Sequence, residues 1–241
     1  MQLFVTFRGQ EIVLPMSYRH ILQGVIYHTL EYTEGHASAT QLHDEGYRSD
    51  DRTFKLFTFG LLKGSYTIHD KYIVFHDTVQ WEIRSIDEQL IRQLAGGLIV
   101  GSKQSLGKNE VEIVAVRIAD EHIDRPAAII AMQSPIVAYR TLEDNRTVFH
   151  SPEEQAFYAA IIRNAQRKWQ SWYPNEPFEL DIRPLLQQKF RKEATRFKQT
   201  FITAWYGCFD LSGLPEVLDF VYQTGLGAKS SQGFGMFTAV P

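Results

Sequence analysis

Apolar residues recur along the chain with two different spacings. Short runs rich in β-branched and aromatic residues predict strands, because these side chains pack well on a pleated surface. Apolar residues three and four positions apart predict amphipathic helices after Pro15 and from Ile86 to Leu94. Polar residues 8–10 predict a turn, and Gly96 and Gly97 interrupt the second helical pattern. The predicted strands of the first half are residues 3–7, 54–59, 72–75 and 111–116.

The second half of the chain repeats this arrangement. A helix is predicted at Ser151, where an N-cap serine, Pro152 at the first helical position and Glu154 of a capping box coincide. Its core-facing residues are Phe157, Ile161 and Ala165. A last helix has an apolar stripe, with Pro215 near its start, formed by Leu214, Val217, Leu218 and Val221. The predicted strands of this half are residues 128–132, 178–182, 189–191, 197–205 and 234–240.

The first half therefore has the order βαββαβ, which is typical of a ferredoxin-like unit, and the second half repeats it with one additional short strand between its helices. The charged segment of residues 119–126 ends in proline and predicts the boundary between the two units. We expect an α+β fold of two tandem ferredoxin-like (RRM-like) domains, residues 1–120 and 126–241.

Composition narrows the class of protein. The chain has 241 residues, 44% of them hydrophobic and 22% charged, which excludes a disordered chain and a fibre. No stretch approaches the roughly 18 apolar residues of a membrane span, and the N-terminus lacks the features of a signal peptide, so no membrane partner is expected. The single cysteine, Cys208, forms no internal disulfide and fits a cytoplasmic location.

Charge is distributed unevenly along the chain. The net charge of −3 argues at face value against a nucleic-acid partner. Residues 183–200, however, carry six basic residues against one acidic residue, a net +5, which leaves −8 for the rest. Basic residues on paired strands can follow a phosphate backbone, although a solvated hairpin is the alternative interpretation. The basic residues are Arg183, Lys189, Arg191, Lys192, Arg196 and Lys198.

A glycine-rich segment, residues 225–235, lies close to the C-terminus. Glycine permits positive φ or a close approach to a ligand, and backbone N–H groups together with Lys229, Ser230 and Ser231 could bind phosphate. A P-loop is excluded because Ala228 stands where glycine must precede the lysine. The alternative interpretation is that Gly225 only ends the preceding helix. The four glycines are Gly225, Gly227, Gly233 and Gly235.

This segment resembles the C-terminal signature of the CRISPR-associated RAMP endoribonucleases that process precursor CRISPR RNA (the Cas six family). Further segments are similar to that family in the same order along the chain, namely residues 15–30, 42–46, 54–59, 133–137 and 203–205. The resemblance implies two tandem ferredoxin-like domains, which agrees with the pattern of apolar residues. It also implies that a hairpin in the basic region contacts the stem of the repeat RNA.

The resemblance implies a catalytic tyrosine, histidine and lysine, which fall on Tyr27, His43 and Lys55. On a helical wheel Tyr27 lies opposite the apolar stripe, so we expect it outside the core. His36 is the rival of His43, and a solvated lysine at the start of a strand is the alternative for Lys55. Such a set would cut RNA without metal or another cofactor, through attack by the RNA's own 2′-OH.

Metal catalysis is the competing interpretation of the histidines, six of which precede position 77. No pair has the helical spacing of a His-Glu-x-x-His site and no cysteine accompanies them, so we expect no metal site. Two functions stay open: an endoribonuclease that cuts CRISPR repeat RNA, and a non-catalytic relative that holds guide RNA in an effector complex. Other possible partners are effector-complex subunits and a second copy of the chain.

Overall fold

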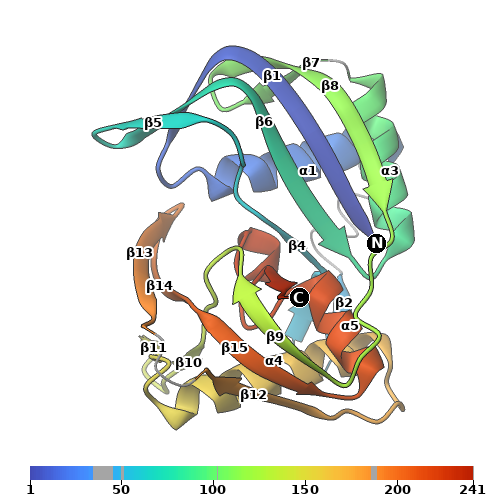
Figure 1. The fold of residues 1–241 in the computed structure, drawn as a ribbon, viewed down its shortest axis with the longest axis vertical. Coiled ribbons are helices and arrows are strands. Elements are labelled where there is room, and N and C mark those ends of the chain that lie inside the picture. The colour runs from blue at the N-terminus through green and yellow to red at the C-terminus, as the bar shows by residue number, and fades with distance from the viewer. Residues whose placement is uncertain (35–45, 50–51, 102, 186–188, 241) are drawn as a thin grey trace.

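The N-terminal half forms one antiparallel sheet with two helices (Figure 1). A computed structural model describes residues 1–34, 46–49, 52–101, 103–185 and 189–240. The helices are α1 (Arg19–Glu34) and α3 (Glu88–Val100). The strand order is β4-β6-β1-β8-β7, with β5 paired to β6. The strands are β1 (Gln2–Pro15), β4 (Phe57–Phe59), β5 (Tyr66–His69), β6 (Tyr72–Ser85), β7 (Lys103–Leu106) and β8 (Asn109–Ala119).

The C-terminal half forms a second sheet with the order β12-β15-β9-β16. In both sheets the first strand of the βαββαβ unit lies between the third and the fourth, so the predicted tandem ferredoxin-like fold is confirmed. Residues 120–126 connect β8 to β9, and the domain boundary placed there stays a prediction. The elements are β9 (Ala127–Met132), α4 (Gln155–Trp172), β12 (Leu180–Pro184), β15 (Cys208–Gly213), α5 (Pro215–Thr224) and β16 (Phe237–Ala239).

The turn predicted at residues 8–10 is wrong. These residues belong to β1, which pairs with β6 along its whole length and shifts register between Gly9 and Glu11. Strand β8 pairs with the other edge of β1 as far as Arg8. The polar segment therefore stays in the sheet because its neighbours satisfy its backbone groups, and a bulge absorbs the irregularity.

Two predicted helix ends also differ from the structure. Helix α3 continues through Gly96 and Gly97, because its apolar stripe extends to the buried Leu98 and outweighs the cost of glycine, about 1 kcal/mol each. Helix α4 begins at Gln155 rather than after Ser151. Glu154 still accepts a hydrogen bond from the Ser151 N–H (3.2 Å), but it does so within a turn that precedes the helix.

Three hairpins are inserted into the two units. The predicted strands at residues 189–191 and 197–205 form the longest hairpin with shifted ends, and the run at 54–59 is interrupted after Phe54. The predicted closing strand shortens to β16 because residues 233–236 remain in a loop. The hairpins are β2 (Tyr47–Ser49) with β3 (Arg52–Phe54), β10 (Tyr139–Thr141) with β11 (Thr147–Phe149), and β13 (Arg191–Phe197) with β14 (Thr200–Tyr206).

Polar contacts join the two units where they meet. Arg84 of β6 is almost fully buried, pairs with Glu82 (2.6 Å) and donates to the Phe237 carbonyl of β16 (2.8 Å). The N-terminal amine donates to the side chain of Gln223 on α5 (2.8 Å). Within the described residues, no helix combines the length and apolar character needed to cross a membrane.

Replacing Gly96 with alanine should stabilise the protein. A Cβ at this exposed helical position meets no atom within 4 Å, so alanine gains helix propensity without a clash. We expect the free energy of unfolding to rise by about 0.5–1 kcal/mol in urea titrations. Gly24→Ala on α1, which is equally unobstructed, should behave alike. A loss of stability in Gly96→Ala would contradict the assignment of an unbroken α3.

Candidate functional site

Tyr27 and Lys55 meet between α1 and the segment that joins β3 to β4. The Lys55 ammonium lies 5.3 Å from the centre of the Tyr27 ring. The ring also packs edge-on against Phe57, 6.5 Å between centroids, at the rim of the core. Tyr27 is thus not among the buried core residues, as the helical wheel predicted, but β4 passes beside α1 and half-buries the ring. This burial raises the pKa of Tyr27 to about 12, so the phenol keeps its proton at neutral pH.

A cavity of about 320 Å³ opens at this pair. Its walls come from α1, the segment after β3, the tip of the β13–β14 hairpin and the glycine-rich loop. Residues far apart in the sequence, predicted separately as catalytic and as RNA-binding, thus line one space. The lining residues are Gln23, Tyr27, Lys55, Phe197, Lys198, Thr200, Lys229, Ser231 and Gln232. His43 and its rival His36 lie outside the described residues.

The glycine-rich loop is packed inside the protein rather than laid open to a ligand. All four glycines are buried and have φ between +73° and +85°. A Cβ at Gly233 would lie 2.6 Å from the Phe59 ring, and one at Gly227 would lie 2.6 Å from the Val137 carbonyl. The N–H groups of Gly225, Gly233 and Gly235 already donate to main-chain carbonyls.

These glycines pack closely against the two units, while Gly227 and Ser230 also line a neighbouring cavity, so contact of the loop with phosphate stays a prediction from the sequence. Gly225 also ends α5, as the alternative interpretation held: its N–H donates to the Val221 carbonyl (2.8 Å). The half-buried part of the loop is Lys229, Ser231 and Gln232. Burial lowers the pKa of Lys229 from its ordinary value, and an anion beside it would oppose that shift.

Side chains of the N-terminal unit hold this loop by its carbonyl groups. Arg19 is only 3% exposed, pairs with Glu193 of β13 (2.7 Å) and lies over the Phe234 ring. The same helix, α1, thus positions Tyr27, the hairpin and the loop. The bonds to the loop are Arg19 Nε to Gly233 O (3.2 Å), Gln23 Nε2 to Ser231 O (2.7 Å) and Thr58 Oγ1 to Phe234 O (3.2 Å).

Lys168 holds the loop from the C-terminal unit. Its ammonium donates to the carbonyls of Thr224 (3.2 Å) and Gly225, where α5 ends. The side chain is only 2% exposed, and burial lowers the pKa of Lys168 to about 7. Sequence analysis missed this residue, although it follows Ala165 by three positions and so shares the buried stripe of α4.

The outer face of the β13–β14 hairpin alternates cations with aromatic rings. The Lys192 ammonium lies 5.9 Å from the centre of Trp205, and the Arg196 guanidinium lies 5.5 Å from that of Phe201. Phe201 is 74% exposed. Exposed rings beside basic groups can stack bases while the cations contact phosphates. Arg191, Lys192, Arg196 and Lys198, like Lys189 before the hairpin, are exposed.

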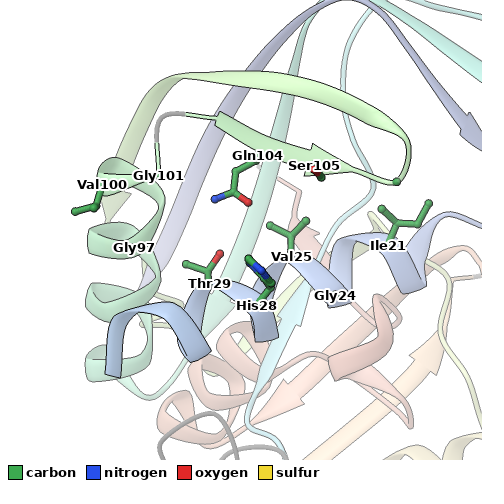
Figure 2. Close-up of a pocket in the computed structure, with 11 residues that line it drawn as sticks. Ile21, Gly24, Val25, His28, Thr29, Gly97, Val100, Gly101, Gln104 and Ser105 are labelled. Carbon is green, nitrogen blue, oxygen red and sulfur yellow. The ribbon is translucent and has the colours of Figure 1, made fainter. Parts of the chain in front are cut away.

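A larger cavity, about 590 Å³, lies elsewhere, between α1 and α3 beneath β7 (Figure 2). His28, Thr29 and Gln104 surround it together with Val25 and several glycines. Of the predicted site residues that the structure describes, none lines it. The smaller cavity is therefore the candidate site, since Tyr27, Lys55 and other predicted site residues line it.

Comparison with known proteins identifies the family of this chain. The family model described as "CRISPR associated protein Cas6, C-terminal" matches residues 118–239, just over half of the chain. The chain belongs to the Cas6 family. Over 229 residues it is 24% identical to the CRISPR-associated endoribonuclease Cas6 of Pyrococcus furiosus, covering 92% of this chain and 82% of that protein. It is 26% identical to the CRISPR-associated endoribonuclease Cas6 1 of Methanocaldococcus jannaschii, covering 95% and 88%.

Solved structures agree with the fold. A structure described as "An RAMP protein binding different RNA substrates" superposes with a TM-score of 0.84 at 21% identity, covering all of both chains. A structure described as "CRISPR associated protein Cas6" has a TM-score of 0.79 at 24% identity, covering 100% of this chain and 99% of the other. The Cas6 fold therefore extends over the full length of the chain.

Gly235→Ala should destabilise the protein strongly. A Cβ there would overlap the Leu226 carbonyl, and φ is +76°. We expect a loss of at least about 2 kcal/mol in the free energy of unfolding, or no folded protein. Gly96→Ala, the same change at an unobstructed position, is the control. Equal stability of the two variants would contradict the packed loop.

Lys168 should make stability depend on pH. Above pH 7 the folded protein has lost this proton, whereas the unfolded chain keeps it up to about pH 10. The unfolded state then binds more protons, so stability rises with pH by up to about 1.4 kcal/mol per unit within this window. Urea titrations from pH 6.5 to 9.5 should show this slope in the wild type and its loss in Lys168→Met. Parallel profiles of the two proteins would contradict it.

Proposed function

We propose that this chain is an endoribonuclease that cuts precursor CRISPR RNA within each repeat and so yields mature guide RNAs. The observation that carries the proposal is the cavity in which Tyr27 and Lys55 lie together with Lys198 and Lys229. Membership of the Cas6 family supports it, as do the names of the curated relatives. The chemistry that such a cavity suits is stabilisation of an anionic phosphate group.

The proposed reaction uses the RNA's own 2′-OH as the nucleophile. A base removes the 2′-OH proton, the 2′ oxygen bonds to phosphorus, and the bond from phosphorus to the 5′ oxygen breaks. An acid returns a proton to the 5′ oxygen, leaving a 2′,3′-cyclic phosphate and a 5′-OH end. The family resemblance assigns proton transfer to His43, and histidine is the side chain type best suited to proton transfer near neutral pH.

Tyr27 and Lys55 have different roles in this scheme. Because Tyr27 keeps its proton, it serves as a hydrogen-bond donor to a phosphate oxygen rather than as a phenolate base. Lys55 and Lys229, which both line the cavity, stabilise the charge that develops on the phosphorane. No step in this scheme requires a metal ion.

The hairpin supplies the substrate-binding surface of the proposal. Its outer cations and rings suit the phosphates of an RNA stem and bases outside it. The tip of the hairpin, at Lys198 and Thr200, forms part of the cavity wall, so bound RNA would continue directly toward Lys55. Effector-complex subunits or a second copy as partners, and a cytoplasmic location, stay predictions from the sequence.

Cleavage assays on RNA with the CRISPR repeat sequence of the same organism test the proposal. His43→Ala should lower the single-turnover rate by about 10²–10⁴-fold, because it removes an acid–base group. Lys55→Met and Tyr27→Phe should each lower it by about 10²–10³-fold, because each removes one donor to the phosphate. His36→Ala tests the rival histidine: it should cleave at the wild-type rate, and loss of cleavage in His36→Ala instead of His43→Ala would assign the role to His36.

Two substrates define the reaction. Wild-type protein in EDTA should cut the all-ribose repeat and leave a repeat with one 2′-deoxy substitution at the cut site intact. Cleavage of the deoxy substrate at that site, or a requirement for metal, would refute the 2′-OH mechanism. Tight binding without cleavage of either RNA would instead favour the non-catalytic guide-RNA holder.

A further inference from the structure

Three arginines surround a separate cavity on the other side of the glycine-rich loop. Arg140 comes from β10, and Arg163 and Arg167 lie one turn apart on α4. The cavity measures about 240 Å³, and its wall includes Tyr139, Asn164 and Ala228 of the loop. The cavity with these three arginines is called the arginine pocket below. Because Arg140 is distant in the sequence from Arg163 and Arg167, the three do not form a basic run.

The arginine pocket contains an uncompensated concentration of positive charge. Within the described residues, none of its three guanidinium groups has a carboxylate within 4 Å, whereas Arg146 and Arg183 pair with Asp144 and Asp181. Glu154 is close enough for Arg140 to help lower its pKa, but the main cause of that shift is its hydrogen bond to His150. Like charges around one cavity repel each other, and an anion between them would remove that cost.

A second observation points to a ligand. The Asn164 side-chain oxygen is buried at the wall of this cavity and has no hydrogen-bond partner within the described part of the chain. Buried amide groups normally find a partner, and an unmade hydrogen bond costs about 1–3 kcal/mol. Because this oxygen accepts a hydrogen bond, a 2′-OH of bound RNA or a water that enters with it would satisfy the group, whereas a phosphate oxygen would not.

The arginine pocket is continuous with the candidate active site. A third cavity of about 370 Å³ shares Tyr139, Asn164 and Ala228 with the arginine pocket. The same cavity shares Lys55, Lys229, Ser231 and Gln232 with the Tyr27 cavity. Lys229 stands between the two ends, with its ammonium 5.5 Å from the centre of the Tyr139 ring. The hairpin tip and the arginine pocket are therefore the two ends of one track that passes Tyr27 and Lys55.

We propose that the arginine pocket binds a backbone phosphate of the RNA on the side of the cut site opposite to the hairpin. The inference rests on the proposed function and deepens it, because it adds a second anchoring point for the same substrate. Planar guanidinium groups suit a phosphate, since each can donate two parallel hydrogen bonds to its oxygens. A free phosphate ion would satisfy the same chemistry, but continuity with the active site favours the RNA backbone as its source.

Arg163→Gln/Arg167→Gln removes two of the three charges and is compared with Arg92→Gln/Lys108→Gln. The control changes net charge equally at exposed positions outside the three cavities. Fluorescence anisotropy is measured with repeat RNA carrying a 2′-deoxy residue at the cut site, so that no cleavage occurs during the titration. The pocket variant should bind about tenfold more weakly, and its salt dependence, log Kd against log salt, should flatten by about 0.7 per lost contact.

Shortened RNAs locate the contact. Repeat RNA is trimmed one nucleotide at a time from either end, and the affinities of variant and control should converge once one end passes the pocket. Equal affinity and salt slope of variant and control on the full-length RNA would overturn the proposal, as would an equal deficit at every length from both ends. Inorganic phosphate bound by the wild type but not by the pocket variant, with RNA affinity unchanged, would identify a free-anion site instead.

Two further measurements separate failure of the arginine pocket from misfolding of the double variant and from failure of the proposed function. Arg163 is exposed, so Arg163→Gln alone should flatten the slope by about half as much if the double variant does not fold. Wild-type cleavage of the all-ribose RNA is recorded in parallel. Its absence refutes the proposed function, whereas the pocket is decided by the binding data alone.

Discussion

The carbonyl groups of one C-terminal loop decide how the two ferredoxin-like units come together. Positive φ at its four glycines lets this loop pass between the sheets where a Cβ has no room. Donors from both units reach its carbonyls, Arg19 and Gln23 from one side and Lys168 from the other. The candidate site depends on this contact, because Tyr27 and Lys55 belong to one unit and Lys229 to the other.

Buried cations stabilise the contact in a way that favours one arrangement. Arg19 and Arg84 are each no more than 3% exposed, and each donates to main-chain carbonyls of the other unit. Burying a cation costs several kcal/mol, and good hydrogen-bond geometry offsets that cost only in the native arrangement. A displaced loop would leave these charges without acceptors. The positions of Lys229 and Lys55 around one cavity are therefore maintained by groups that take no part in the proposed chemistry.

Sequence patterns predicted the strand and helix order because these features depend on neighbouring residues in the sequence. The apolar stripe on α4 and Pro215 at the start of α5 are two such local signals. The bulge at Gly9 and the continuation of α3 through Gly96 have no such local signal, since pairing and packing with distant segments determine them. At the site, the helical wheel placed Tyr27 away from the apolar stripe, but it could not predict that Tyr27 lies next to Lys55. That meeting was implied by the family resemblance, and the packing of the glycines could not be predicted because their neighbours are distant in the sequence.

The net charge of −3 is a poor guide to RNA binding for a similar reason. RNA affinity depends on how many cations reach phosphates, because each contact releases counterions, whereas total charge sets only a weak background. The basic hairpin is visible as a run within residues 183–200, but Arg140, Arg163 and Arg167 come together only through the packing of α4 beside β10 and the loop. An acidic chain can thus concentrate positive charge at both ends of one track.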